Sequence, residues 1–124
     1  MGARSEVLDG YTYRALTGCG NLYITVNHNE EGKLIEVFVR LGKAGGCAAS
    51  QSEALGRLIT LALKAGASME VVIKQLAGIG CHQPSGFGAT KALSCADAVA
   101  KVLTRVLQKV EKKVFIGEEH ETKS

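Results

Sequence analysis

Apolar and polar positions alternate through the first third of the chain, which is the pattern of strands with one buried face. The alternation predicts three β-strands, around Tyr11–Ala15, Leu22–Asn27 and Leu34–Arg40. A polar turn at His28–Lys33 separates the second strand from the third. The connections are too short for a crossover helix, so the strands are expected to pair antiparallel.

Beyond the glycine-rich segment Gly42–Cys47, the apolar residues recur at helical spacing and predict three helices. Ser50–Glu53 fits a capping box for the first helix, and Ser68 is placed to cap a shorter second one. Ser94, with Asp97 three residues on, is placed to cap a last helix from about Cys95 to Val114. The predicted apolar faces, in chain order, are Leu55, Leu58, Ile59 and Ala62; Met69, Val72, Ile73 and Leu76; and Val99, Val102, Leu103, Val106 and Val110.

This order of elements predicts an α+β fold, with a three-stranded antiparallel sheet followed by three helices packed on one face. The domain is expected at residues 11–114, between a flexible N-terminus at residues 1–10 and a flexible tail at residues 115–124. The length of 124 residues suits one domain and excludes enzymes that need two large ones. No apolar run is long enough to cross a bilayer and no export signal is found, so the cytoplasm is the expected location.

The formal charge of +3 is too small to indicate a nucleic-acid partner by itself. One side of the last predicted helix is nevertheless basic. It could contact phosphate, but no aromatic residues interleave for base stacking, so a solvated helix face is the favoured interpretation. The basic residues are Lys101, Arg105, Lys109, Lys112 and Lys113, against Glu111.

The four cysteines carry the clearest chemical signal, and all of them fall at predicted turns or helix starts. They are Cys19, Cys47, Cys81 and Cys95. Disulfides are rare in a reducing cytosol, and the absence of a Cys-x-x-Cys pair excludes the thioredoxin motif and the zinc-ribbon knuckle. Core cysteines usually lie within apolar stripes, whereas a helix start stabilises the thiolate that a metal requires. This placement favours a shared metal site over four buried structural thiols, with His82 as an alternative ligand or a solvated neighbour.

Three segments closely resemble the TSCPD domain: Gly18–Asn27, Val37–Cys47 and Leu93–Ala100. That domain occurs at the carboxyl end of adenosylcobalamin-dependent (class II) ribonucleotide reductases and as small free-standing proteins. The resemblance runs from about Tyr11 to Leu107, although Ala96 replaces the proline of the name motif. The reductase barrel and its cobalamin site are missing from this chain. The resemblance therefore implies a metal-binding accessory module rather than a chain that reduces ribonucleoside diphosphates alone.

A fainter resemblance links the sequence to iron–sulfur cluster scaffolds of the IscU/SufU type, which are also β-β-β-α. It implies that Cys19, Cys47 and Cys95 correspond to the three scaffold cysteines, while Asn21 stands where the scaffolds have a ligating aspartate. With Cys81 added, four thiolates form a closed tetrahedral site that suits structural zinc.

Two alternatives to the zinc module stay open. The first is a detached reductase subunit that serves deoxyribonucleotide synthesis, and the second is an iron–sulfur cluster scaffold or carrier. The expected partners are a class II reductase chain, nucleic acid or a second copy of this chain, and not a membrane.

Overall fold

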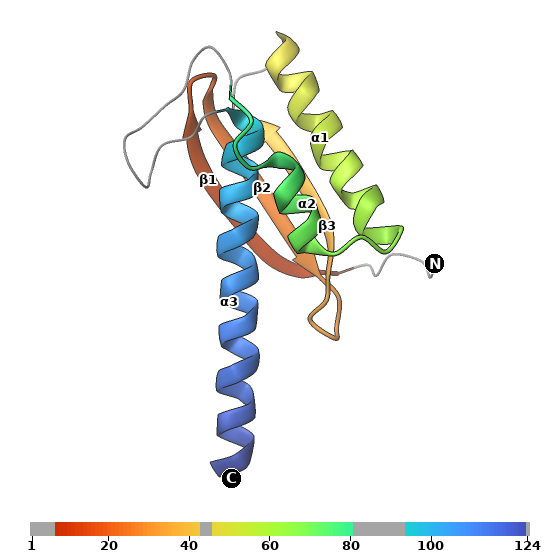
Figure 1. Ribbon diagram of the computed structural model, residues 1–124, viewed down its shortest axis with the longest axis vertical. Helices are drawn as coiled ribbons and strands as arrows, with labels where there is room; N and C mark the ends of the chain where they lie inside the picture. Colours follow the sequence, from red (N-terminus) through yellow and green to blue (C-terminus); the bar gives the residue numbers. More distant parts are fainter. Residues whose placement is uncertain (1–6, 43–45, 81–93, 124) are drawn as a thin grey trace.

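The computed structural model describes residues 7–42, 46–80 and 94–123, with side chains described as far as Glu111 (Figure 1). A three-stranded sheet comes first and three helices follow, which confirms the predicted α+β order. The strands are β1 (Asp9–Thr17), β2 (Gly20–His28) and β3 (Leu34–Leu41), and the helices are α1 (Gly46–Lys64), α2 (Met69–Leu76) and α3 (Cys95–Lys123).

The sheet has the order β1-β2-β3, and both strand pairs are antiparallel, as predicted. Alternation along the strands places Leu22, Ile24 and Val26 on the inner face, each with no exposed surface. Val37 and Val39 join them from β3. The opposite, outer face of the sheet is much more exposed.

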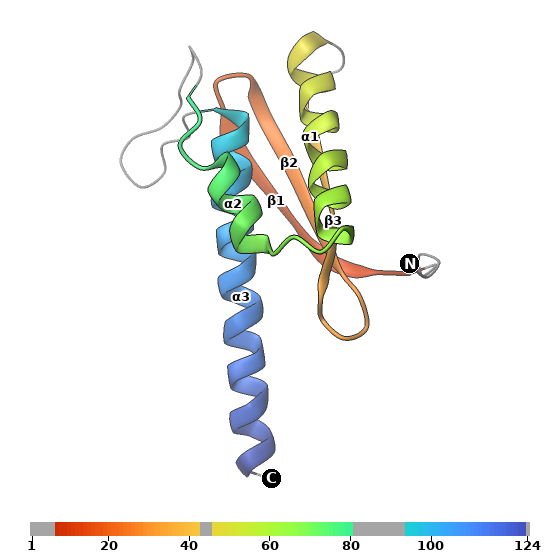
Figure 2. The ribbon, with the colours of Figure 1, turned by 45° about the vertical axis from the view of Figure 1, so that its right-hand side comes forward.

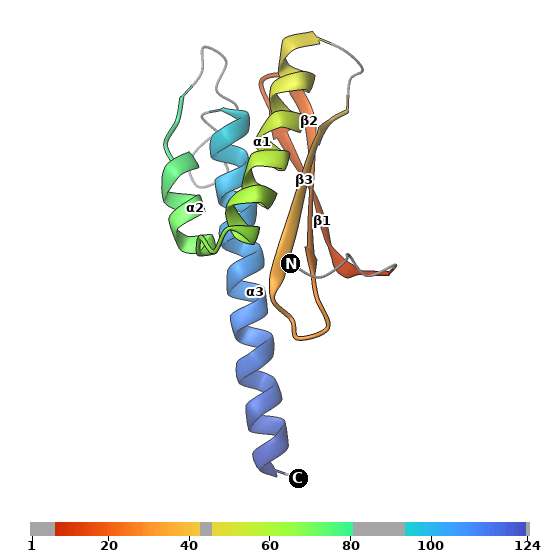
Figure 3. The ribbon, with the colours of Figure 1, turned by 90° about the vertical axis from the view of Figure 1, so that its right-hand side faces the viewer.

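All three helices lie on the inner side of the sheet (Figure 3). Helix α3 packs against β1 and β2, α2 lies beside α3, and α1 lies along β3 (Figure 2). The apolar stripe predicted for α3 is confirmed, because Val99, Val102, Leu103 and Val106 are all buried in the core. Within the described ranges, no helix is both long and apolar enough to cross a membrane.

Helix α1 differs from the sequence prediction in its start and in its buried face. It begins at Gly46, so Ser50 is inside the helix and donates a hydrogen bond to the Cys47 carbonyl oxygen at 3.0 Å; the predicted capping box is wrong. Leu58, predicted on the apolar face, is 64% exposed, whereas Gly56 is buried. The reason is a close approach to β3: a Cβ at Gly56 would stand 2.8 Å from the Val39 amide nitrogen.

Strand β3 forms a free edge of the sheet. Helix α1 provides hydrogen-bond partners for part of the backbone at this edge. The Val37 N–H donates to the Thr60 hydroxyl oxygen at 2.9 Å, and that hydroxyl donates back to the Val37 carbonyl oxygen at 3.0 Å. One threonine side chain thus takes the place of a neighbouring strand at this residue. An edge covered in this way is protected from pairing with another chain.

The caps of the other two helices agree with the sequence. The Ser68 hydroxyl accepts from the Val71 N–H at 3.2 Å at the start of α2. The Ser94 hydroxyl accepts from the Asp97 N–H at 3.1 Å at the start of α3. Helix α3 extends past the predicted end at Val114, because a single glycine without a following proline does not stop a helix.

Candidate metal site

The structure gathers three of the four predicted cysteine ligands at one end of the molecule. Cys19 lies in the turn between β1 and β2, Cys47 in the first turn of α1, and Cys95 at the first residue of α3. This turn and these two helix starts lie at the same end in every view (Figures 1 and 2). The fourth predicted ligand, Cys81, and its neighbour His82 lie outside the described residues.

Cys19 and Cys95 both form hydrogen bonds with one buried hydroxyl group, that of Thr17. The Cys95 thiol donates to Thr17 Oγ1 at 3.6 Å, and the Cys19 backbone N–H donates to the same oxygen at 3.2 Å. The Thr17 hydroxyl in turn donates to the Gly20 carbonyl oxygen at 2.9 Å. Thr17 is only 4% exposed, so the contact between the turn and α3 is shielded from water.

The hydrogen-bonding capacity of Thr17 is fully used in this arrangement. A hydroxyl group has one proton to donate and two lone pairs to accept with, and the three bonds occupy all of them. The start of α3 is therefore fixed against the β1–β2 turn. Sequence spacing did not indicate Thr17, which is the residue that brings these two cysteines together.

Cys47 is exposed, and neither Cys47 nor Cys95 forms a disulfide bond. Within residues 7–42, 46–80 and 94–123, no group of three or more histidine, cysteine or acidic side chains is close enough to hold a metal ion. The described residues thus bring Cys19 and Cys95 to one hydroxyl, with Cys47 at the same end. Thiolates are the ligands that zinc and iron–sulfur clusters prefer, so the chemistry of this donor set fits either group.

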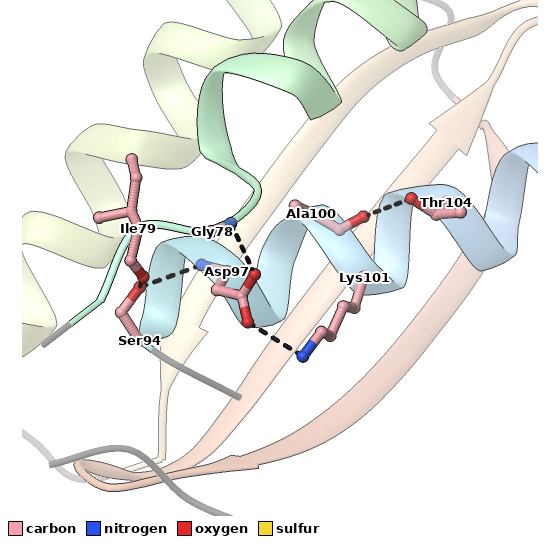
Figure 4. Close-up of polar contacts among 7 residues, drawn as sticks. All are labelled: Gly78, Ile79, Ser94, Asp97, Ala100, Lys101 and Thr104. Atoms are coloured by element: carbon pink, nitrogen blue, oxygen red, sulfur yellow. Dashed lines mark hydrogen bonds and ion pairs between the residues drawn. The ribbon is translucent and has the colours of Figure 1, made fainter. Parts of the chain in front are cut away.

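The first turn of α3 is held by Ser94 and Asp97, both nearly buried (Figure 4). The Ser94 hydroxyl donates to the Ile79 carbonyl oxygen at 2.5 Å, while the Asp97 carboxylate accepts from the Gly78 N–H at 2.9 Å. Asp97 also forms an ion pair with Lys101 at 3.0 Å. These contacts join the segment after α2 to the first turn of α3, the turn that carries Cys95.

The basic side of α3 is engaged with the sheet and with its own first turn. Besides the Lys101–Asp97 pair, the Arg105 guanidinium lies 5.6 Å from the centre of the Tyr13 ring, and the Lys109 ammonium lies 4.7 Å from that of Tyr11. Such cation–π contacts help to hold α3 on β1. The side chains of Lys112 and Lys113 lie outside those described.

A second feature, which the sequence did not indicate, is an open groove of about 1190 Å³ between β3 and α1. Its walls include Tyr23, Phe38 and Arg40 from the sheet, with Glu53 and Arg57 from the helix. The exposed positions of β3 were the available signal, because Phe38 and Arg40 alternate with its buried valines.

The chain belongs to the TSCPD domain family, since the family model for the TSCPD domain matches residues 3–107. The match includes Cys19, Cys47, Cys81 and Cys95. No match was found among curated proteins, and none was found among solved structures. The likeness to IscU/SufU scaffolds therefore stays a prediction from the sequence.

Proposed function

We propose that this TSCPD chain is a non-catalytic metal-binding module in which Cys19, Cys47, Cys81 and Cys95 hold one zinc ion. The observation that supports the proposal best is the shared contact with Thr17, which is 78 positions from Cys95 in the sequence. A bound zinc ion would supply a closed structural cross-link of four thiolates. The β1–β2 turn and the starts of α1 and α3 are the segments that it would join.

The Thr17 contact also indicates that Cys95 must lose a proton and a hydrogen bond when it binds a metal. The thiol donates a hydrogen bond to the Thr17 hydroxyl oxygen, whereas a metal ligand must be a thiolate. Cys95 would give up that proton on binding. A sulfur atom already held at the end of a helix needs little further ordering, which reduces the entropic cost of assembling the site.

The metal content of protein purified without added metal tests the proposal. We expect about one equivalent of zinc in a colourless preparation. Serine substitutions at Cys19, Cys47, Cys81 and Cys95 should each lower the zinc content and the melting temperature. Lys74→Ala, at an exposed position of α2, is the control and should change neither.

Three outcomes distinguish the alternatives. A brown anaerobic preparation with visible absorbance would replace zinc by an iron–sulfur cluster and favour the scaffold function. Protein without zinc or iron would contradict a metal site of either kind. Four silent cysteine substitutions would contradict it as well, even if some metal were found.

The second part of the proposal is an accessory role beside a class II ribonucleotide reductase, in deoxyribonucleotide synthesis. It is supported by membership of the TSCPD family and by the sequence resemblance to the carboxyl-terminal domain of those enzymes. Affinity capture with the tagged chain from its source cell provides the test. A reductase catalytic chain among the captured proteins is expected, and its absence would contradict the accessory role without affecting the metal site.

A further inference from the structure

No described helix lies across the outer face of the sheet, although its β3 side borders the groove with α1 (Figure 3). Every helix lies on the inner side, so side chains of alternate strand residues on the outer side are available to a partner. The outward positions of the three strands include Thr12, Arg14, Leu16, Tyr23, Thr25, Phe38 and Arg40. We call this set the outer face.

Two cations and one aromatic ring form a row across the outer face. In the strand register, Tyr23 of β2 is paired with Arg14 of β1 on one side and with Arg40 of β3 on the other. The Arg40 guanidinium lies 5.7 Å from the centre of the Tyr23 ring. Directly opposite residues on one face of a sheet are neighbours, so both cations flank this ring.

A second aromatic side chain, Phe38, stands beside this row. It is 52% exposed and pairs with Thr25, whose hydroxyl is hydrogen-bonded to that of Thr12 at 2.9 Å. Phe38 and Tyr23 are diagonal neighbours on adjacent strands, and residues in this relation lie roughly 7–8 Å apart. An exposed phenylalanine on this face contributes nothing to the core, so its ring is free to stack with a ligand.

The acidic groups around the outer face leave this row basic. Glu36, on the same side of β3, is 4% exposed and accepts a hydrogen bond from the Asn27 amide at 2.8 Å. Glu53, on the rim formed by α1, pairs with Arg57 at 3.6 Å. Glu30 is exposed in the hairpin at the opposite end of the strands. The row therefore attracts an anion.

We propose that the outer face binds single-stranded nucleic acid, with Phe38 and Tyr23 stacking on bases and with Arg14 and Arg40 contacting phosphates. A single strand supplies both flat rings and regularly spaced phosphates, and sheets with exposed aromatic residues bind such strands by stacking. The described cations Lys101, Arg105 and Lys109 of α3 contact groups on the inner side of the sheet or in α3 itself, whereas Arg14 and Arg40 are exposed on the outer face, Arg40 beside the Tyr23 ring. This proposal does not depend on the metal site.

Fluorescence anisotropy with a short fluorescein-labelled oligothymidylate tests the proposal at low and rising salt. We expect saturable binding. The logarithm of the association constant should fall with the logarithm of the salt concentration with a slope of about −1.4, the value for two phosphate contacts on a single strand. Phe38→Ala should weaken binding about 5- to 150-fold, as loss of one stacked base does. The double substitution Arg14→Ala and Arg40→Ala should weaken binding and flatten the salt dependence.

Matched controls come from the helical side of the molecule. Leu58→Ala removes an exposed apolar side chain from α1, and Lys74→Ala removes an exposed cation from α2; both should bind as the unaltered chain does. Phe38→Tyr keeps the ring and should retain binding, which distinguishes stacking from an effect on folding.

Absence of binding at low salt would overturn the proposal. It would equally be overturned if Phe38→Ala bound normally while remaining folded by circular dichroism, or if the controls weakened binding as much as the outer-face variants. If Phe38→Ala does not fold, the double arginine variant decides the question, because normal binding by that variant would overturn the proposal.

Discussion

The Thr60→Val substitution tests the idea that α1 protects the free edge of the sheet. Valine has nearly the same shape and a similar helix propensity, so the change removes the hydroxyl group and little else. It deletes both hydrogen bonds between Thr60 and the backbone of Val37, a residue with 1% of its surface exposed. A buried N–H and a buried C=O then lose their partner.

The expected loss follows from the two backbone groups. Leaving a buried polar group unsatisfied costs about 1–3 kcal/mol, and two such groups are affected here. The added methyl group regains at most about 0.8 kcal/mol through apolar burial. Because Thr60 lies at a half-buried position where water relieves part of the penalty, we expect a net loss of about 2 kcal/mol in the free energy of unfolding.

Urea unfolding followed by circular dichroism measures this loss as a lower midpoint with an unchanged slope. Thr104→Val is the matched control: the Thr104 hydroxyl donates only to the Ala100 carbonyl of its own helix, at 2.9 Å. It should cost less than about 0.5 kcal/mol. Thr60→Ser, which keeps the hydroxyl, should recover most of the stability. Equal losses in the two valine variants, or none at Thr60, would refute the edge role.

Four further substitutions test the packing of the helices by the same unfolding assay. Gly56→Ala should destabilise the fold by about 1 kcal/mol, because the new Cβ would meet the backbone of Val39; higher stability from the better helix former would contradict the close approach. Asp97→Ala should cost about 2 kcal/mol and Lys101→Ala less than about 1, since the carboxylate is buried and the lysine is half exposed; equal losses would show that the ion pair dominates. Ser94→Ala should cost about 1 kcal/mol through loss of the helix cap, and an unchanged midpoint would argue against the cap.

Features of the fold that depend on neighbours in sequence were predictable. The caps at Ser68 and Ser94 and the apolar stripe of α3 follow from local rules, because a cap reaches only the next helical turn and a stripe needs only helical spacing. Strand alternation likewise predicted the three strands, and the short connections predicted their antiparallel pairing.

The orientation of α1 was not predictable in this way. Apolar spacing indicated Leu58 on the buried face, but α1 meets a strand edge through Gly56 and Thr60, residues chosen for close approach and hydrogen bonding rather than for hydrophobicity. Cysteine spacing likewise carries no distances. The placement of all four cysteines at turns and helix starts predicted a shared site, yet the common contact of Cys19 and Cys95 is made through Thr17, whose role appears only once the turn and the helix are packed together.

The zinc site itself is tested most directly by X-ray absorption at the zinc edge of the purified protein. The account predicts a coordination shell of four sulfur atoms at about 2.3 Å, with one sulfur lost on Cys95→Ser. A shell of nitrogen and oxygen atoms, or a sulfur count that Cys95→Ser leaves unchanged, would contradict the proposal that these cysteines hold the metal.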